Sequence, residues 1–171
     1  SVLEGEADLG FCSKIFSDPQ LEYAAIQSRP MVAAVPLDHP LAQQESVTLE
    51  ETLPYPHVTY SWPSGQRDPV DRLFAPVRDR WHIAYEVEDA NFILELVAQG
   101  FGITVLPDTP PVHRPGVKRL PVTDPVQTSD FYIVRQKAPH LLAAADQFFD
   151  YCVGQANGMD LTNEQLPPSA R

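Results

Sequence analysis

The chain has 171 residues, of which 43% are hydrophobic and 20% charged, and its formal net charge is −11. This length suits one domain or two small lobes that share a core, and the composition is that of a folded protein. Such an acidic surface repels the phosphate backbone of nucleic acids, so we expect this chain not to bind DNA by itself. The alternative is that the negative charge only keeps the domain soluble. No apolar run reaches eighteen residues and the first residues carry no signal-peptide pattern, so we predict no contact with a membrane.

The apolar pattern alternates between short strands and helices, which predicts an α/β fold. The strands are expected at residues 7–12, 21–27, 31–36, 57–60, 83–87, 101–106, 117–120 and 130–135. The helices are expected at residues 48–53, 69–74, 91–99 and 140–153, and one more is expected to end at Gly5. Residues 154–171 are polar and contain prolines, and we expect them to form a disordered tail.

Local signals predict where three of these helices begin. Thr48 is placed to cap the first helix, with Glu51 at the capping-box position. Asp68 is expected to cap the second helix, because Pro69 after it fits the first helical position. Asp89 is expected to start the third helix in the same way.

The third helix has the strongest amphipathic pattern in the chain. We expect Phe92, Ile93, Leu96 and Val97 to share its buried face, and Gly100 to end it. A helix with one apolar face buries that face against a sheet, so we expect this helix to anchor the middle part of the chain.

The order of the expected strands predicts two lobes. Residues 1–30 form the first lobe, residues 31–130 the second, and residues 131–155 return to the first, followed by a tail at 156–171. A chain that leaves one lobe, builds another and returns creates a hinge and a cleft. A hinged cleft is the usual setting for a small ligand that closes it.

Four motifs, in order, carry a resemblance to a known family. Residues 4–10 (EGEADLG), 38–42 (DHPLA), 47–53 (VTLEETL) and 94–107 (LELVAQGFGITVLP) resemble segments of the effector-binding domain of LysR-type transcriptional regulators. Residues 10–19 (GFCSKIFSDP) are similar to members of that family that sense metabolites of aromatic-compound degradation. The order and spacing of the motifs extend the resemblance over most of the chain.

The resemblance implies a periplasmic-binding-protein-like (type 2) fold of two α/β subdomains, with an effector in the cleft between them. It also implies a homo-oligomer, a dimer or tetramer, that binds promoter DNA through an N-terminal winged helix-turn-helix. That DNA-binding part is absent from this chain, and so is the opening strand–helix–strand of the first subdomain. We therefore expect the first lobe to be incomplete here.

The effector is expected to contact the carboxyl ends of strands and the first turns of helices, where free N–H groups favour an anion. The family alignment places such contacts near Ser13 in the first lobe and near 66–68 in the second. The expected effector-binding residues are Cys12, Ser13, Ser61, Ser64, Gly65, Gln66, Arg67, Asp68, Asp89, Asn91 and Phe92.

Arg67 is the expected partner of an effector carboxylate, because its planar guanidinium suits bidentate contact. Four of the expected residues also have a structural interpretation. Arg67 can be a solvated surface residue, Ser64 and Gly65 can serve turn geometry, and Asp89 can be a simple helix cap.

The sequence gives no support to catalysis. It lacks a G-x-S-x-G nucleophile elbow, a P-loop and an H-E-x-x-H motif. Its five histidines are scattered without metal-ligand spacing. We expect no catalytic residue, no metal and no cofactor.

Cys12 and Cys152 lie far apart in the sequence and are expected to be free thiols, which fits reducing cytoplasm. Together with the resemblance, this predicts a cytoplasmic effector-sensing domain of a LysR-type regulator, whose effector is a small carboxylate. The alternative is a periplasmic-type solute-binding protein of the same fold.

Overall fold

The computed structural model describes residues 2, 4–13, 15–62, 64–137 and 143–157. The chain forms two compact units: unit 1 comprises Ser1–Ser28 and Asp130–Arg171, and unit 2 comprises Arg29–Ser129. Within the described part of the chain, no helix combines the length and the apolar character needed to cross a membrane.

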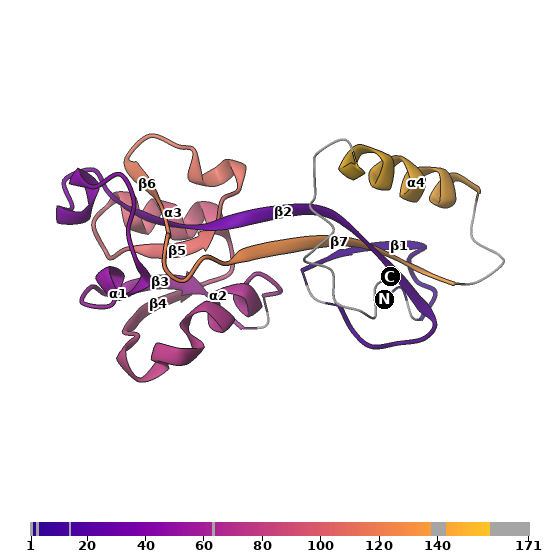
Figure 1. Ribbon diagram of the computed structural model, residues 1–171, viewed down its shortest axis with the longest axis horizontal. Helices are drawn as coiled ribbons and strands as arrows, with labels where there is room; N and C mark the ends of the chain where they lie inside the picture. Colours follow the sequence, from indigo (N-terminus) through magenta and orange to yellow (C-terminus); the bar gives the residue numbers. More distant parts are fainter. Residues whose placement is uncertain (1, 3, 14, 63, 138–142, 158–171) are drawn as a thin grey trace. The chain divides into compact units, whose positions relative to one another are not determined.

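Strands and helices alternate as expected for an α/β protein (Figure 1). The strands are β1 (Leu9–Cys12), β2 (Leu21–Pro36), β3 (His57–Tyr60), β4 (Ile83–Val87), β5 (Thr104–Pro107), β6 (Val117–Pro121) and β7 (Thr128–Gln136). The helices are α1 (Leu49–Thr52), α2 (Arg67–Phe74), α3 (Ala90–Ala98) and α4 (Ala143–Asn157), with short 3-10 helices at Pro40–Gln43, Ala75–Arg80 and Pro110–Val112.

Two of the predicted strands are one strand. Residues 21–27 and 31–36 were expected to be separate, but β2 runs unbroken for 16 residues, straight through Pro30. A proline lacks an N–H but keeps its carbonyl, and the carbonyl of Pro30 accepts a hydrogen bond from Asp108 N–H at 2.9 Å. The proline therefore costs one donor at this position without ending the strand.

The larger sheet has the order β1-β7-β2-β5, and β6 also pairs with β2. In this sheet β1 pairs with β7, and β2 pairs with β5 and β6, all antiparallel; in unit 2, Ala33 of β2 lies opposite Val105 of β5 on one side and Leu120 of β6 on the other. The smaller sheet pairs β3 with β4 in parallel. An isolated bridge between His57 and Ile103 connects β3 to β5.

The first and last predicted helices differ from the structure. The described residues before Gly5 form a turn rather than a helix, closed by a bond from Gly5 N–H to Val2 O at 3.2 Å. At the other end, α4 continues past Gly154 to Asn157, so the first residues of the predicted tail are helical. Residues 140–142 of the predicted helix, and 158–171 of the tail, lie outside the described residues.

In unit 1, Arg135 links α4 to the strands. Arg135 of β7 forms ion pairs with Glu22 of β2 at 2.8 Å and with Asp146 of α4 at 3.1 Å. Its guanidinium also lies over the ring of Phe149, 4.0 Å from the centroid. The hydrogen bond that Arg135 donates to Glu22 raises the pKa of the arginine, so it stays charged.

The helix caps of unit 2 follow the sequence signals except at α2. Thr48 and Glu51 form the predicted capping box of α1. Asp89 accepts from the N–H groups of Asn91 and Phe92, as expected of the cap of α3. The prediction for Asp68 is wrong: α2 begins at Arg67, with Gln66 at the cap position and no side-chain cap bond, so Asp68 lies inside the first turn.

The C-terminus of α3 ends at Gly100 as predicted. Gly100 has φ +80, and its N–H donates to Val97 O at 2.9 Å. The N–H of Phe101 donates to Leu96 O at 3.0 Å, which completes a Schellman motif. A glycine is favoured at this position because only it adopts a positive φ without strain.

The buried face of α3 is rotated from the predicted one. Ile93, Leu94 and Val97 are buried, whereas Phe92 is 56% exposed and Leu96 is half-buried. The apolar run of this helix is compatible with a face through 92, 93, 96 and 97 or through 93, 94 and 97. Periodicity cannot choose between these two faces, and the sheet of unit 2 selects the second.

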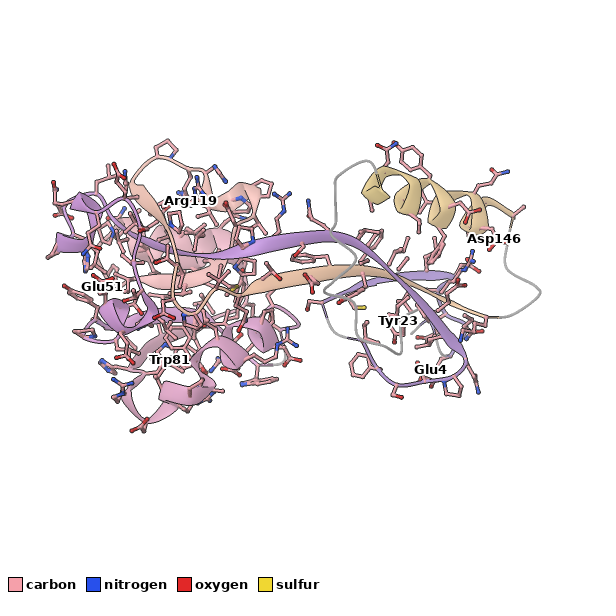
Figure 2. All side chains as sticks on the ribbon, in the orientation of Figure 1. Glu4, Tyr23, Glu51, Trp81, Arg119 and Asp146 are labelled. Atoms are coloured by element: carbon pink, nitrogen blue, oxygen red, sulfur yellow. The ribbon has the colours of Figure 1, made fainter. Side chains whose placement is uncertain are left out.

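An aromatic cluster surrounds the buried His57 of β3. Its ring lies 5.2 Å from the ring of Phe74, and Phe74 stacks on Trp81 with centroids 4.1 Å apart. Trp81, labelled in Figure 2, precedes β4. The Nδ1 of His57 lies 3.0 Å from the carbonyl of Tyr55, which fits a neutral ring that donates from Nδ1. Burial lowers the pKa of His57 to about 4.

We predict that Leu94→Ala destabilises unit 2 by about 2–5 kcal/mol, because it deletes a fully buried leucine side chain. Phe92→Ala is the control on the same helix and should cost under about 1 kcal/mol, since that ring is largely in solvent. Urea unfolding of both variants measures the difference. A larger loss in Phe92→Ala than in Leu94→Ala would mean that the face predicted from the sequence is the buried one.

We also predict that His57 makes stability depend on pH. The unfolded state takes up a proton as pH falls below the ordinary pKa of histidine, near 6.5, while folded His57 stays neutral down to about pH 4. The contribution of this residue is present above pH 6.5, and about 2 kcal/mol of it is lost between pH 7 and pH 5. Urea unfolding at both pH values checks this, with the exposed His82→Gln as control. A wild-type slope retained in His57→Gln would contradict it.

Candidate functional site

Polar side chains interrupt the apolar end of β3. The hydroxyls of Thr59 in β3 and of Ser61 just after it are buried and have no hydrogen-bond partner. The backbone at this point is well held, because Ser61 N–H donates to Val87 O at 2.9 Å. The hydroxyls of Thr59 and Ser61 can therefore each donate or accept a hydrogen bond from a fixed position in the backbone.

A second pair of such groups lies where β2 and β7 meet in unit 2. The Oγ of Ser129, whose residue is 0% exposed, and the Nε of Arg29 are both buried and have no partner. An unsatisfied buried polar group costs about 1–3 kcal/mol, so such groups are uncommon in folded proteins unless a ligand or an ordered water completes them.

The Ser129 segment contacts the start of α2. The side-chain amide of Gln127 donates to Pro69 O at 2.8 Å, while the carbonyl of Gln127 accepts from Met31 N–H at 3.0 Å. Side chains two residues apart on an extended strand lie on the same face. Ser129 therefore lies on the face of its strand that Gln127 presents to α2.

The loop from β3 to α2 is built from consecutive turns. Ser64 N–H donates to Ser61 O at 3.0 Å, and Arg67 N–H donates to Ser64 O at 3.0 Å. The hydroxyl of Ser64 accepts from Gln66 N–H at 3.3 Å. The N-cap residue of α2, Gln66, makes no side-chain cap bond, and the carboxylate of Asp68 lies in the first turn of the helix.

The predicted residues Ser61, Ser64, Gly65, Gln66, Arg67 and Asp68 are thus brought together by the loop and the first turn of α2. Arg67 differs most from its expected role, because its side chain is 1% exposed and already bonded. Its Nε donates to Asp71 at 2.8 Å, and its Nη1 donates to Glu86 at 2.6 Å and to the carbonyl of Tyr60.

Two tryptophans complete the surroundings of Arg67. Its guanidinium lies over the rings of Trp62 and Trp81, at 5.8 and 5.4 Å from their centroids. Burial lowers the pKa of Arg67, but the bonds to Asp71 and Glu86 outweigh it, so the pKa is raised. These contacts favour a structural role, in which Arg67 ties β3, β4 and α2 together behind the loop.

The predicted residues Asp89, Asn91 and Phe92 lie together at the start of α3. The carboxylate of Asp89 accepts from Asn91 N–H at 2.9 Å and from Phe92 N–H at 3.2 Å, so these donors are occupied. Burial, with the charge of Asp89 as a smaller cause, raises the pKa of Tyr60 to about 12. A negative charge already occupies this helix terminus, which makes it unfavourable for an anionic ligand.

The two remaining predicted residues belong to unit 1. Cys12 is the last residue of β1 and lies opposite Tyr132 of β7. Ser13 follows it and is buried. Cys12 and Cys152 are both free thiols.

The sequence did not predict Arg29, Thr59 and Ser129 as site residues, because the predicted effector contacts lie in loops and at helix starts, whereas these three residues lie in strands. For Thr59 a signal was present, because it is a polar residue between the apolar strand residues Val58 and Tyr60, whereas Ser129 lies between the polar residues Thr128 and Asp130 and gives no such signal. Three further buried polar atoms have no partner in the described chain: His57 Nε2, Trp81 Nε1 and Thr104 Oγ1. The described residues contain no group of three or more His, Cys, Asp or Glu side chains arranged to hold a metal ion.

Comparison with known proteins identifies the family. Residues 1–157 match the family described as LysR substrate binding domain. An uncharacterized HTH-type transcriptional regulator of Escherichia coli, YbhD, is 30% identical over 151 residues, which are 87% of this chain and 48% of that protein. The chain spans about half the length of the curated relatives it matches.

Solved structures show the same fold. The effector binding domain of QuiR in complex with shikimate is 26% identical, with a TM-score of 0.84 over 92% of this chain and 75% of that one. HinK, a LysR family transcriptional regulator from Pseudomonas aeruginosa, is 25% identical, with a TM-score of 0.77 over 92% of this chain and 56% of that one. The chain therefore belongs to the LysR substrate binding domain family, has the α/β, periplasmic-binding-protein-like effector-binding fold of those transcription regulators, and is not an enzyme.

Proposed function

We propose that this chain senses a small organic anion for a LysR-type transcription regulator. The observation that carries the proposal is a set of buried, unpartnered polar groups in unit 2: Arg29 Nε, Thr59 Oγ1, Ser61 Oγ and Ser129 Oγ. Hydroxyl and guanidinium donors suit a carboxylate, which accepts hydrogen bonds from both. The related QuiR domain was solved with shikimate, itself a carboxylate.

The family resemblance refines this proposal. It adds Cys12 and Ser13 to the effector-binding residues, together with the loop residues Ser64, Gly65, Gln66 and Asp68. The likeness of residues 10–19 to members that sense aromatic-degradation metabolites supports a carboxylate of that kind. We assign Arg67 to holding the loop, because the effector would have to compete with Asp71 and Glu86 for its donors.

The activity of the whole protein is proposed from the family. In this proposal a winged helix-turn-helix outside this chain binds promoter DNA, and the effector shifts a homo-oligomer between states of different DNA affinity. Such a regulator acts in the cytoplasm, on the chromosome. The effector-binding chain itself supplies the differential affinity for the effector that any such shift requires.

We predict that the effector affinity depends on Ser61. A thermal-shift screen of small carboxylates identifies a ligand, and calorimetry then compares variants. Ser61→Ala should weaken its binding about 5- to 10-fold, because one hydrogen bond is lost. The exposed Ser17→Ala is the matched control and should leave the affinity unchanged. A carboxylate bound equally well by both variants would remove Ser61 from the site.

We also predict that the 171-residue chain alone does not bind duplex DNA at physiological salt. Its formal charge of −11 repels phosphates, and counterion release needs clustered Lys and Arg. A gel-shift titration with random and promoter duplexes measures this. Binding at nanomolar concentrations would show that this chain reads DNA itself and would contradict the division of labour proposed above.

A further inference from the structure

Arg29 differs from the other described arginines in its surroundings. Six arginines form ion pairs with carboxylates: Arg67, Arg78, Arg80, Arg114, Arg119 and Arg135. Among the described residues, only Arg29 and Arg72 lack such a pair, and Arg72 is exposed. Arg29 is half-buried, and its Nε is buried without any hydrogen-bond partner.

This arrangement is unfavourable unless something else completes it. A buried N–H of a cation that has no hydrogen-bond partner loses its hydration and gains nothing in return. The chain has 23 acidic residues, yet none of those that the structure describes forms an ion pair with Arg29. An anion from outside the chain would supply the missing partner.

The strand register brings a second donor to Arg29. β2 and β7 are neighbours in the sheet. Met31 N–H donates to Gln127 O at 3.0 Å, and the hydroxyl of Ser28 donates to Asp130 at 2.6 Å. These two contacts lie on either side of the pair, so the same register places Arg29 opposite Ser129. Directly opposed residues of antiparallel strands have Cβ atoms about 4.5–5.5 Å apart on one face.

The chemistry of the pair suits an oxyanion. The guanidinium offers an N–H and a full positive charge, and the hydroxyl of Ser129 offers a second donor. Asp130 projects to the opposite face of β7, where it bonds Ser28, and so does not compete. Ser129 shares its face with Gln127, whose side-chain amide donates to Pro69 O of α2. Arg29 and Ser129 therefore lie on the side of the strands that faces α2.

We propose that Arg29 and Ser129 form the subsite for the anionic group of the effector, with Arg29 Nε–H and the Ser129 hydroxyl donating to one carboxylate. This rests on the proposed function and makes it specific: Arg29, rather than Arg67, selects charged over neutral ligands. The hydroxyls of Thr59 and Ser61 then bind other polar groups of the same molecule.

The test uses the chain with formate, the smallest carboxylate, and with shikimate and its uncharged methyl ester. Melting temperature is measured against sodium chloride at equal ionic strength. The wild type should be stabilised by formate and shikimate but not by the ester. Arg29→Met should lose this stabilisation, with Kd for shikimate rising at least about tenfold, and Ser129→Ala should raise it about 5-fold. Arg72→Met, which removes an equally unpaired but exposed arginine, and Ser17→Ala should behave as wild type.

Stability without ligand provides a second measurement. In chloride alone, Arg29→Met should melt no lower than wild type, because it removes a buried N–H donor that has no partner. Arg29→Lys keeps the charge but lacks the Nε–H, so it should bind shikimate more weakly than wild type even if Arg29→Met fails to fold.

Unchanged carboxylate affinity in Arg29→Met or in Arg29→Lys would overturn the subsite while leaving the proposed function standing. A wild-type chain that discriminates neither anion from chloride nor acid from ester would count against both. Loss of melting temperature in Arg29→Met with unchanged Kd would show that Arg29 is structural.

Discussion

The hydrogen bonding of β2 on both sides is the constraint on which unit 2 depends. Residues Val32, Ala33 and Ala34 pair with β5 on one edge and with β6 on the other. Because their backbone groups are buried, each needs a partner, and losing either neighbour would leave a row of unsatisfied amides. The alanines leave no bulky side chain on the strand, which is 0% exposed at both positions. This strand also determines where its neighbours lie. It positions β3, through the bridge of β3 to β5, and it positions α2 and α3 on the sheet.

The same strand carries Arg29 to the edge of unit 2, and its neighbour β7 carries Ser129. The two arginines, buried Arg67 and half-buried Arg29, differ in their carboxylate partners. Arg67 is neutralised by Asp71 and Glu86 and orders the loop through the carbonyl of Tyr60. Arg29 has no such counter-ion. In an acidic chain, an anionic ligand needs a local positive charge that internal carboxylates have not already claimed, and only the second arginine meets that need.

The features predicted correctly from sequence are those that depend on neighbouring residues. The capping box of Thr48 and Glu51, the cap by Asp89 and the glycine stop at Gly100 each join groups within about one helical turn. Two predictions were wrong because the local sequence signal fits more than one structure. Pro30 signals a strand end, but its carbonyl is still paired, and the run at 92–97 is compatible with two helix faces.

The site required contacts that no local pattern encodes. Arg67 reaches Glu86, 19 residues away, and Arg29 lies opposite Ser129, on a strand that returns only after unit 2 is complete. A sequence window shows an arginine in a polar loop and another beside a proline, and the first is the more conspicuous candidate. Whether an arginine is available to a ligand depends on its carboxylate partners, and those are set by the fold.

The two helices that begin near the predicted site illustrate the same dependence. Both α2 and α3 present a positive N-terminal end, and sequence alone makes either a candidate for an anion. At α3 the carboxylate of Asp89 fills that position and bonds two N–H groups. At α2 the N-cap residue Gln66 makes no cap bond and Asp68 lies in the first turn, while Gln127 holds the Ser129 segment against Pro69. An effector carboxylate bound by Arg29 and Ser129 would therefore depend on strand residues for its donors, whereas the N–H groups at the start of α3 are already occupied by Asp89.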